Sequence, residues 1–262
     1  MSFSNYYSAY WLRPVRALGL ILLIIIGLAT LAFVFPWLNQ KRRGLISQYW
    51  SRRLLRLMGI RLHITGTRPA SAAVLVANHV SWADPFLLVA CYPVQFVAKA
   101  EIRSWPIFGW IAAQGGTIFI QRERQRDLAT VAQAFVAYLK HGTAVGMFPE
   151  STTSDGTQLL PFKPALFQVA VNTAADCYPV AIHYDNCAAI WTGDMGFVSS
   201  IWRIMAQPRI NASVNFCSPI HYQGQHRREL AAASASAISA ALSLPDPHSS
   251  PEIPADLPAA AR

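Results

Sequence analysis

A histidine and an aspartate stand five positions apart in the segment 78–85, Asn-His-Val-Ser-Trp-Ala-Asp-Pro. The imidazole of His79 can take a proton from an attacking hydroxyl near neutral pH. A carboxylate that accepts the other ring N–H fixes the tautomer and stabilises the imidazolium that forms. Asp84 provides that carboxylate if a strand ends at His79 and a turn brings the aspartate back. The pair therefore predicts general-base catalysis on a hydroxyl.

The same aspartate also fits a purely structural role. Asp84 followed by Pro85 is typical of a helix N-cap with proline at the first helical position. The two roles are compatible, because a cap would hold the carboxylate in place. We expect the remaining histidines to be structural or solvated, since they lie in no recognisable motif; they are His63, His141, His183, His221, His226 and His248. No histidine forms a metal-binding pattern, so no metal is implied.

Further along the chain, polar side chains stand beside strand-like stretches, in the blocks 116–122 (Gly-Thr-Ile-Phe-Ile-Gln-Arg), 148–154 (Phe-Pro-Glu-Ser-Thr-Thr-Ser) and 178–181 (Tyr-Pro-Val-Ala). Arg122 can grip a phosphate or carboxylate through two parallel hydrogen bonds. Glu150 can accept hydrogen bonds from substrate hydroxyls or hold Arg122, with helix capping as the alternative. Lys99 can stabilise negative charge in a tetrahedral intermediate or contact a phosphate, and a plain surface lysine fits equally well.

Taken in order, these blocks resemble the glycerolipid acyltransferase family over residues 70–185. The family's signature is a histidine and an aspartate separated by four residues, then Gly-x-x-Phe-Ile-x-Arg, then Phe-Pro-Glu-Gly-Thr-x-Ser, then a strand with a proline. Residues 99–102 also look like its Lys-x-Glu-Leu element. The resemblance implies that His79 and Asp84 are catalytic, and that substrate is contacted by Lys99, Gly116, Arg122, Phe148, Pro149, Glu150, Ser151, Thr152 and Pro179.

The resemblance implies an O-acyltransferase that moves an acyl chain from acyl-CoA or acyl-carrier protein to the free hydroxyl of a lysophospholipid, without a cofactor. The default acceptor is 1-acyl-sn-glycerol 3-phosphate, which would give phosphatidic acid. The continuation 152–156, Thr-Thr-Ser-Asp-Gly, resembles a subgroup that includes lyso-ornithine lipid O-acyltransferases, so that acceptor stays open. Ser151 departs from the family's glycine, at a position that would suit a residue with φ > 0.

Composition favours a lipid environment. Hydrophobic residues make up 53% of the chain and charged residues 13%, against about 25% charged in soluble domains. The net charge of +9 favours an anionic partner, either nucleic acid or anionic membrane lipids. No nucleic-acid-binding pattern is present, so we expect no nucleic acid. A membrane-surface binding protein with a degenerate site is the other alternative, and the intact set of His79, Asp84, Arg122 and Glu150 speaks against it.

The segment from Ala17 to Leu38 contains no charged residue and predicts a membrane-anchoring helix within residues 1–43. Its 22 residues give ~33 Å of helix, against a hydrocarbon core of ~30 Å. The helix either spans the bilayer or enters one leaflet and turns back near Pro36. If it spans, the heavier basic load after it places the main domain in the cytoplasm, at the inner membrane.

Three more segments follow the anchor. Residues 44–61 predict a basic amphipathic helix on an anionic membrane surface, with packing of its apolar side on the domain as the alternative. Residues 62–244 alternate strand-like and helix-like stretches and predict an α/β domain with a mixed, largely buried sheet flanked by helices. Its predicted strands are Ala73–Ala77, Val94–Ala98, Thr117–Ile120, Ala144–Phe148 and Tyr178–His183. Residues 245–262, rich in proline and alanine, predict a disordered tail.

Overall fold

The structure, a computed structural model, describes most of the chain between residues 9 and 248. The described ranges are 9–99, 103–104, 109–110, 113, 117–120, 133, 135–140, 142–193 and 195–248. For residues 97–99 and 118–120, only the backbone is described.

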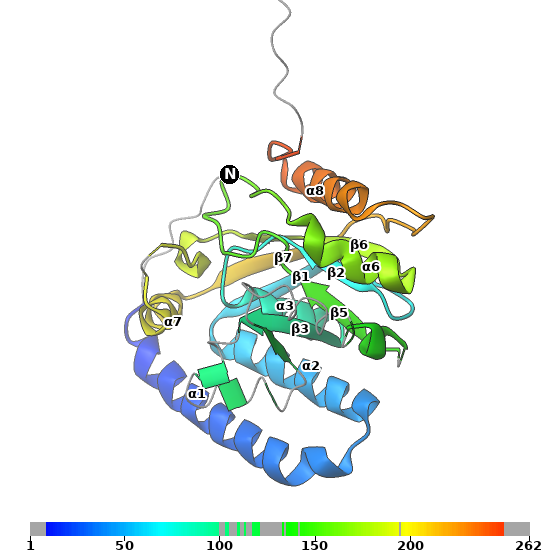
Figure 1. Cartoon of the computed structure of the whole chain (residues 1–262). Helices are drawn as coiled ribbons and strands as arrows, with labels where there is room; N and C mark the ends of the chain where they lie inside the picture. Colours follow the sequence, from blue (N-terminus) through cyan, green and yellow to red (C-terminus); the bar gives the residue numbers. More distant parts are fainter. Residues whose placement is uncertain are drawn as a thin grey trace, which may run out of the picture.

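Within these ranges, seven strands form one mixed sheet with the order β1-β7-β6-β2-β5-β3-β4 (Figure 1). The strands are β1 Ile60–Gly66, β2 Val74–Ala77, β3 Val94–Lys99, β4 Ile118–Ile120, β5 Ala144–Met147, β6 Cys177–Tyr184 and β7 Ile210–Phe216. The strands from β6 to β4 run parallel to one another, whereas β7 is antiparallel to β6 and parallel to β1. The mixed sheet predicted from the sequence is confirmed.

Every residue of β2 and β5 is buried, as expected for central strands of a sheet that is covered on both faces. The sequence did not predict β1 and β7. Both alternate apolar with polar residues, for example Arg61 and His63 in β1, because they lie toward one edge of the sheet. Their signal is weaker than the continuous apolar runs of the central strands.

Helices cover both faces of the sheet (Figure 1). The helices α2 (Gln40–Leu57), α3 (Asp84–Cys91) and α7 (Phe197–Met205) lie on one face. The short helix η4 (Pro164–Phe167), α6 (Gln168–Thr173) and α8 (Arg227–Leu242) lie on the other. Successive strand residues point to opposite faces, so β2 contributes Leu75 and Ala77 to the first cluster and Val74 and Val76 to the second.

The N-terminal helices form an antiparallel hairpin beside the domain. The helix α1 (Leu12–Ala29) continues through η1 (Thr30–Val34) and η2 (Phe35–Trp37), and α2 returns along it. The indole of Trp50 donates a hydrogen bond to the carbonyl of Leu23. The guanidinium of Arg16 donates to the carbonyls of Met205 and Gln207, just after α7. The start of α1 is therefore fixed to the domain.

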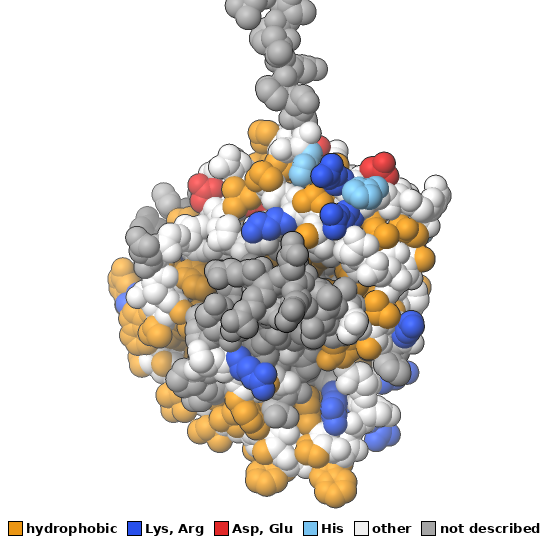
Figure 2. Space-filling view, in the orientation of Figure 1, with side chains coloured by type: hydrophobic (Ala, Val, Ile, Leu, Met, Phe, Trp, Pro, Cys, Tyr) orange, Lys and Arg blue, Asp and Glu red, His pale blue; other side chains and the backbone are white. Residues whose placement is uncertain are grey.

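The outer side of this hairpin is apolar. Leu12–Trp37, with 26 residues, is, among the described residues, the one helical segment long and apolar enough to cross a membrane, and an 18-residue window within it has a mean hydropathy of 2.9. Trp11, Leu18 and Trp37 are 72%, 70% and 86% exposed. Figure 2 shows hydrophobic side chains gathered along the edge of the molecule where α1 runs. The segment therefore has the length and the exposed surface of a membrane anchor.

Two expectations about the flanks of the domain change. The helix predicted over 44–61 begins at Gln40 and ends at Leu57, and its apolar side packs on α3 and the sheet, with Leu54 and Leu55 buried. This is the alternative that the sequence left open, and the exposed side of α2 carries its basic residues together with Leu45 and Tyr49. The predicted tail begins later than residue 245, because His248 accepts a hydrogen bond from the backbone N–H of Phe162. Residues 249–262 lie outside the described residues.

Candidate active site

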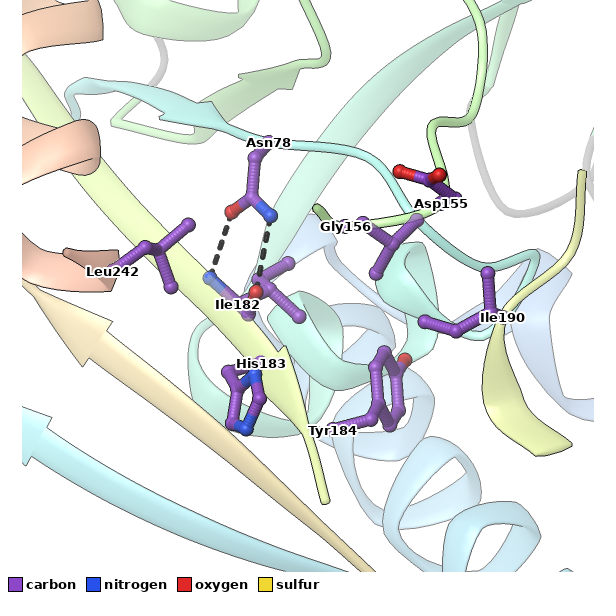
Figure 3. A pocket seen from close by; sticks show the side chains of 9 residues that line it. Asn78, Asp155, Gly156, Ile182, His183, Tyr184, Ile190 and Leu242 are labelled. Atoms are coloured by element: carbon purple, nitrogen blue, oxygen red, sulfur yellow. Dashed lines mark hydrogen bonds between the residues drawn. The ribbon is translucent and has the colours of Figure 1, made fainter. Parts of the chain in front are cut away.

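The segment that carries the predicted catalytic pair leaves the sheet at the carboxyl end of β2. The buried amide of Asn78 donates to the carbonyl of Ile182 at 3.0 Å and accepts from its N–H at 2.7 Å (Figure 3). This pair of bonds ties the end of β2 to β6. The carbonyl of His79 accepts from the N–H of Ser154 at 2.8 Å. The backbone on either side of the imidazole is therefore fixed.

The predicted contact between His79 and Asp84 is confirmed. Nδ1 of His79 lies 2.8 Å from Oδ2 of Asp84. An ionised carboxylate can only accept, so the ring proton resides on Nδ1 and the lone pair on Nε2. Nε2 has no hydrogen-bond partner among the described residues, and the imidazole is 18% exposed. The ring thus presents a basic nitrogen to a substrate from one side and is held from the other.

Asp84 is completely buried, and hydrogen bonds from three parts of the chain surround its carboxylate. Oδ2 also accepts from the backbone N–H groups of Val80 and Ser81, each at 2.8 Å. Oδ1 accepts from the hydroxyl of Tyr184 at 2.7 Å. Within the described part of the chain, no lysine or arginine forms an ion pair with Asp84. Dipolar donors therefore stabilise this buried charge.

The expected N-cap role of Asp84 is wrong. The N-cap of α3 is Ala83, and Asp84 is the first residue of the helix, followed by Pro85 in the first turn. The carboxylate turns back toward the N–H groups of the preceding loop, not toward those of its own helix. Its position at the start of α3 nevertheless holds it rigidly opposite His79.

Glu150 lies three residues after Met147, the last residue of β5, which is the parallel strand next to β2. Its side chain is 4% exposed. Oε1 accepts from the backbone N–H of His79 at 2.7 Å and Oε2 from that of Leu160 at 3.1 Å. Burial raises the pKa of Glu150 to about 7, with a further increase from the charge of Asp84, although the two backbone hydrogen bonds oppose the shift.

This geometry corrects the role predicted for Glu150. Both carboxylate oxygens accept from backbone N–H groups, so the side chain fastens the loop that carries His79 to the turn after β5. An inward-facing, buried carboxylate is poorly placed to bind hydroxyls of a substrate. Carboxyl ends of adjacent parallel strands meet at one edge of a sheet, which explains why two blocks 70 residues apart in the chain converge here.

The aromatic ring of Phe148 supports the imidazole. The rings of Phe148 and His79 stack with centroids 4.2 Å apart and an interplanar angle of 20°. Phe148 stacks in turn on Phe96 of β3, at 5.6 Å. Phe148 was predicted to contact substrate. In the structure its ring contacts the imidazole of His79.

The next residues complete the turn after β5. Pro149 is buried, and its carbonyl accepts from the N–H of Lys163. Ser151 has a φ of 64°, so the position does require the left-handed conformation that glycine adopts without strain. Of the predicted site residues in this block, Thr152 is exposed, Phe148 and Ser151 are half-buried, and Pro149 and Glu150 are buried.

The remaining predicted site residues are only partly placed. Lys99 is the last residue of β3, next to β5, and so lies at the same edge of the sheet. Gly116 and Arg122 lie outside the described residues. Pro179 is buried inside β6, paired with Val76 of β2, so it is a strand residue and not a surface for a substrate.

Sequence reasoning assigned no role to Asn78 or Tyr184. The signal for Asn78 was its place at the end of a buried apolar strand, where an amide must find partners. The signal for Tyr184 was weaker, because a tyrosine that ends an apolar strand is common. Neither partner, Ile182 or Asp84, could be deduced without the pairing of β6 with β2.

Comparison with known proteins identifies the family of this chain. The sequence profile of the acyltransferase family matches residues 59–183. A 1-acyl-sn-glycerol-3-phosphate acyltransferase of Neisseria gonorrhoeae is 39% identical over 158 residues, which cover 57% of this chain and 62% of that one. A lyso-ornithine lipid O-acyltransferase of Pseudomonas aeruginosa is 33% identical over 244 residues, 88% of this chain and 92% of that one.

A solved structure shares the fold. The crystal structure of the 1-acyl-sn-glycerophosphate acyltransferase of Thermotoga maritima matches with a TM-score of 0.67 and 20% identity. The match covers 88% of this chain and 96% of the other.

The raised pKa of Glu150 predicts how stability depends on pH. Between pH 4.5 and about 7, the folded protein keeps a proton that the unfolded chain releases. Stability should therefore decrease as pH rises through this window, by up to about 3 kcal/mol. Glu150→Gln should lose this dependence. Unfolding midpoints of the two proteins in detergent from pH 4.5 to 8 test it, with the exposed Glu229→Gln as control. A difference between wild type and Glu150→Gln that stays constant across the window contradicts the assignment.

Proposed function

Because the chain belongs to the acyltransferase family that includes 1-acyl-sn-glycerol-3-phosphate acyltransferases and lyso-ornithine lipid O-acyltransferases, we propose that it acylates the free hydroxyl of a membrane lysolipid. The observation that carries the proposal is the geometry of His79. Its Nδ1 is bound to a buried carboxylate, and its Nε2 is unpartnered among the described residues, at the carboxyl edge of β2 and β5.

The reaction proceeds directly from thioester to ester. Nε2 of His79 takes the proton of the acceptor hydroxyl as its oxygen attacks the thioester carbonyl of acyl-CoA or acyl-carrier protein. Asp84 stabilises the imidazolium that forms. The tetrahedral intermediate then collapses, the C–S bond breaks, and the departing thiolate takes the proton back from Nε2. No covalent acyl-enzyme is required.

The first candidate acceptor is 1-acyl-sn-glycerol 3-phosphate. The sequence blocks resemble the enzymes that use it, and the Neisseria relative is named for that activity. Arg122 and Lys99 are proposed to bind the phosphate. A second candidate, lyso-ornithine lipid, is favoured by the similarity to the Pseudomonas protein over nearly the whole chain. Ser151, at a position with positive φ, is the local departure from the phosphate-acceptor pattern.

The membrane is proposed to bind the outer side of α1. Exposed apolar residues repeat along it at helical spacing and form a stripe that faces away from α2. They are Trp11, Val15, Leu18, Leu22 and Ile25. The outer residues of α7, Val198 and Trp202, adjoin this stripe, because Arg13 bonds the carbonyl of Trp202 and lies over its ring. Exposed basic residues of α2 are suited to anionic lipid head groups. We propose that the catalytic domain faces the cytoplasm at the inner membrane, because more basic residues follow the anchor than precede it.

The catalytic assignment predicts that His79→Ala lowers acyl transfer by a hundredfold to ten-thousandfold, the range for loss of a general base. His221→Ala is a matched control, since His221 also lies 2.8 Å from an aspartate, Asp176, but is exposed. Turnover is measured with both candidate lysolipids and both donor carriers, and products are identified by mass. Normal turnover by folded His79→Ala contradicts the mechanism, and no acylation of any lysolipid by wild type contradicts the function.

The membrane assignment predicts that the double variant Leu18→Glu, Leu22→Glu binds vesicles of anionic phospholipid more than tenfold more weakly than wild type. Each change removes exposed apolar surface and adds a charge that the bilayer disfavours by about 2 kcal/mol or more. The control carries the same charges at exposed positions of α8, as Ala233→Glu, Ser236→Glu. Flotation of both proteins is the measurement, and equal flotation would show that α1 does not contact lipid.

A further inference from the structure

Tyr184 brings a polar group to a place where packing alone requires none. It ends β6, is 1% exposed, and its ring belongs to the apolar cluster covered by α2, α3 and α7. A phenylalanine would fill the same space, whereas a buried tyrosine hydroxyl needs a hydrogen-bond partner. The hydroxyl donates to Oδ1 of Asp84, at 2.7 Å, and it also has a hydrogen bond with the side chain of Ser81. The hydroxyl is therefore the feature of Tyr184 that packing does not explain.

The two oxygens of Asp84 have different partners. Oδ2 accepts from Nδ1 of His79 and from the N–H groups of Val80 and Ser81. Across the described ranges, Oδ1 accepts only from Tyr184. A buried carboxylate oxygen without a donor is costly, and protonation of the carboxyl relieves that cost. A donor at Oδ1 therefore favours the ionised carboxylate and fixes the plane in which Oδ2 meets His79.

We infer that Tyr184 is a positioning residue of this site: its hydroxyl keeps Asp84 ionised and aligned, so that His79 holds its proton on Nδ1 and its lone pair on Nε2. The inference rests on the proposed function only in naming His79 as the base. Burial and the charge of Asp84 raise the pKa of Tyr184 well above its usual value, so the hydroxyl remains a donor at all pH values of interest.

The register of the sheet determines the position of the Tyr184 hydroxyl. Tyr184 pairs with Ala212 of β7, and the β2–β6 ladder sets β6 beside the loop that follows β2. The buried amide of Asn78 locks the same two strands together two residues before Tyr184, at Ile182. Figure 3 shows Asn78, just after β2, opposite Ile182 of β6, with Tyr184 further along the same strand. The catalytic loop and the tyrosine are thus held by one continuous piece of sheet.

Removing the hydroxyl has a defined electrostatic consequence. In Tyr184→Phe, Oδ1 of Asp84 lacks its donor. The carboxylate therefore becomes more basic and stabilises the protonated form of His79 more strongly. The His79–Asp84 pair then binds a proton at higher pH, on whichever of the two groups it resides. A loss of packing alone would lower the amount of folded enzyme without moving this titration.

The experiment compares full-length wild type and Tyr184→Phe in lipid nanodiscs. The acid limb of the kcat/KM profile is expected to move up by about one pH unit, with kcat at the plateau roughly tenfold lower and KM for the acyl donor unchanged. The titration of His79, followed by NMR of labelled histidine, should move in the same direction and does not depend on turnover. Tyr92→Phe is the control, because that hydroxyl bonds only a neutral carbonyl, that of Ser71.

Two further variants separate positioning from folding. Tyr184→Phe should have a smaller effect in an Asp84→Asn background, since no carboxylate remains to be held. Tyr184→3-fluorotyrosine keeps the packing, strengthens the donor, and should move the His79 titration downward, which provides a test if the phenylalanine variant does not fold.

An unmoved acid limb and titration, or an equal loss of activity in the Asp84→Asn background, would overturn the inference. A wild-type protein that acylates no lysolipid while Tyr184→Phe still shifts the His79 titration would overturn the proposed function and support the positioning role.

Discussion

The fully buried carboxylate of Asp84, with its four hydrogen-bond donors, is the constraint on which the site depends. A buried charge without a cationic partner is tolerated only when donors surround it. Here the donors come from the loop after β2, from the imidazole of His79 and from Tyr184 at the end of β6. The loop must therefore take the path that aims the N–H groups of Val80 and Ser81 at one oxygen. That path places His79 so that its second nitrogen has no partner among the residues that the structure describes.

A second buried carboxylate locks this arrangement to the neighbouring strand. Glu150 follows β5 and accepts the backbone N–H of His79, so the imidazole is held by its ring from one side and by its backbone from the other. Two close carboxylates would repel each other if both were charged. Burial raises the pKa of Glu150 to about 7, which lowers its average charge near neutrality and so weakens its repulsion of Asp84.

The sequence predicted those features of the fold and the site that depend on the spacing of residues within one short segment. It predicted the central strands, the contact of His79 with Asp84, and the glycine-like conformation at Ser151. It did not predict that Glu150 turns inward or that Tyr184 reaches Asp84, because both depend on which strands are neighbours and in what register. Periodicity likewise could not show whether the apolar side of α2 faces lipid or the domain.

The contact between Nδ1 and Oδ2 implies that Asp84 fixes the tautomer of His79, and nitrogen NMR of labelled histidine measures that tautomer directly. In wild type above the titration of the ring, His79 should carry its proton on Nδ1, with a strongly deshielded Nδ1–H signal. In Asp84→Asn that signal should disappear, and the tautomers should mix. A wild-type His79 that carries its proton on Nε2, or a tautomer unchanged in Asp84→Asn, would contradict the account.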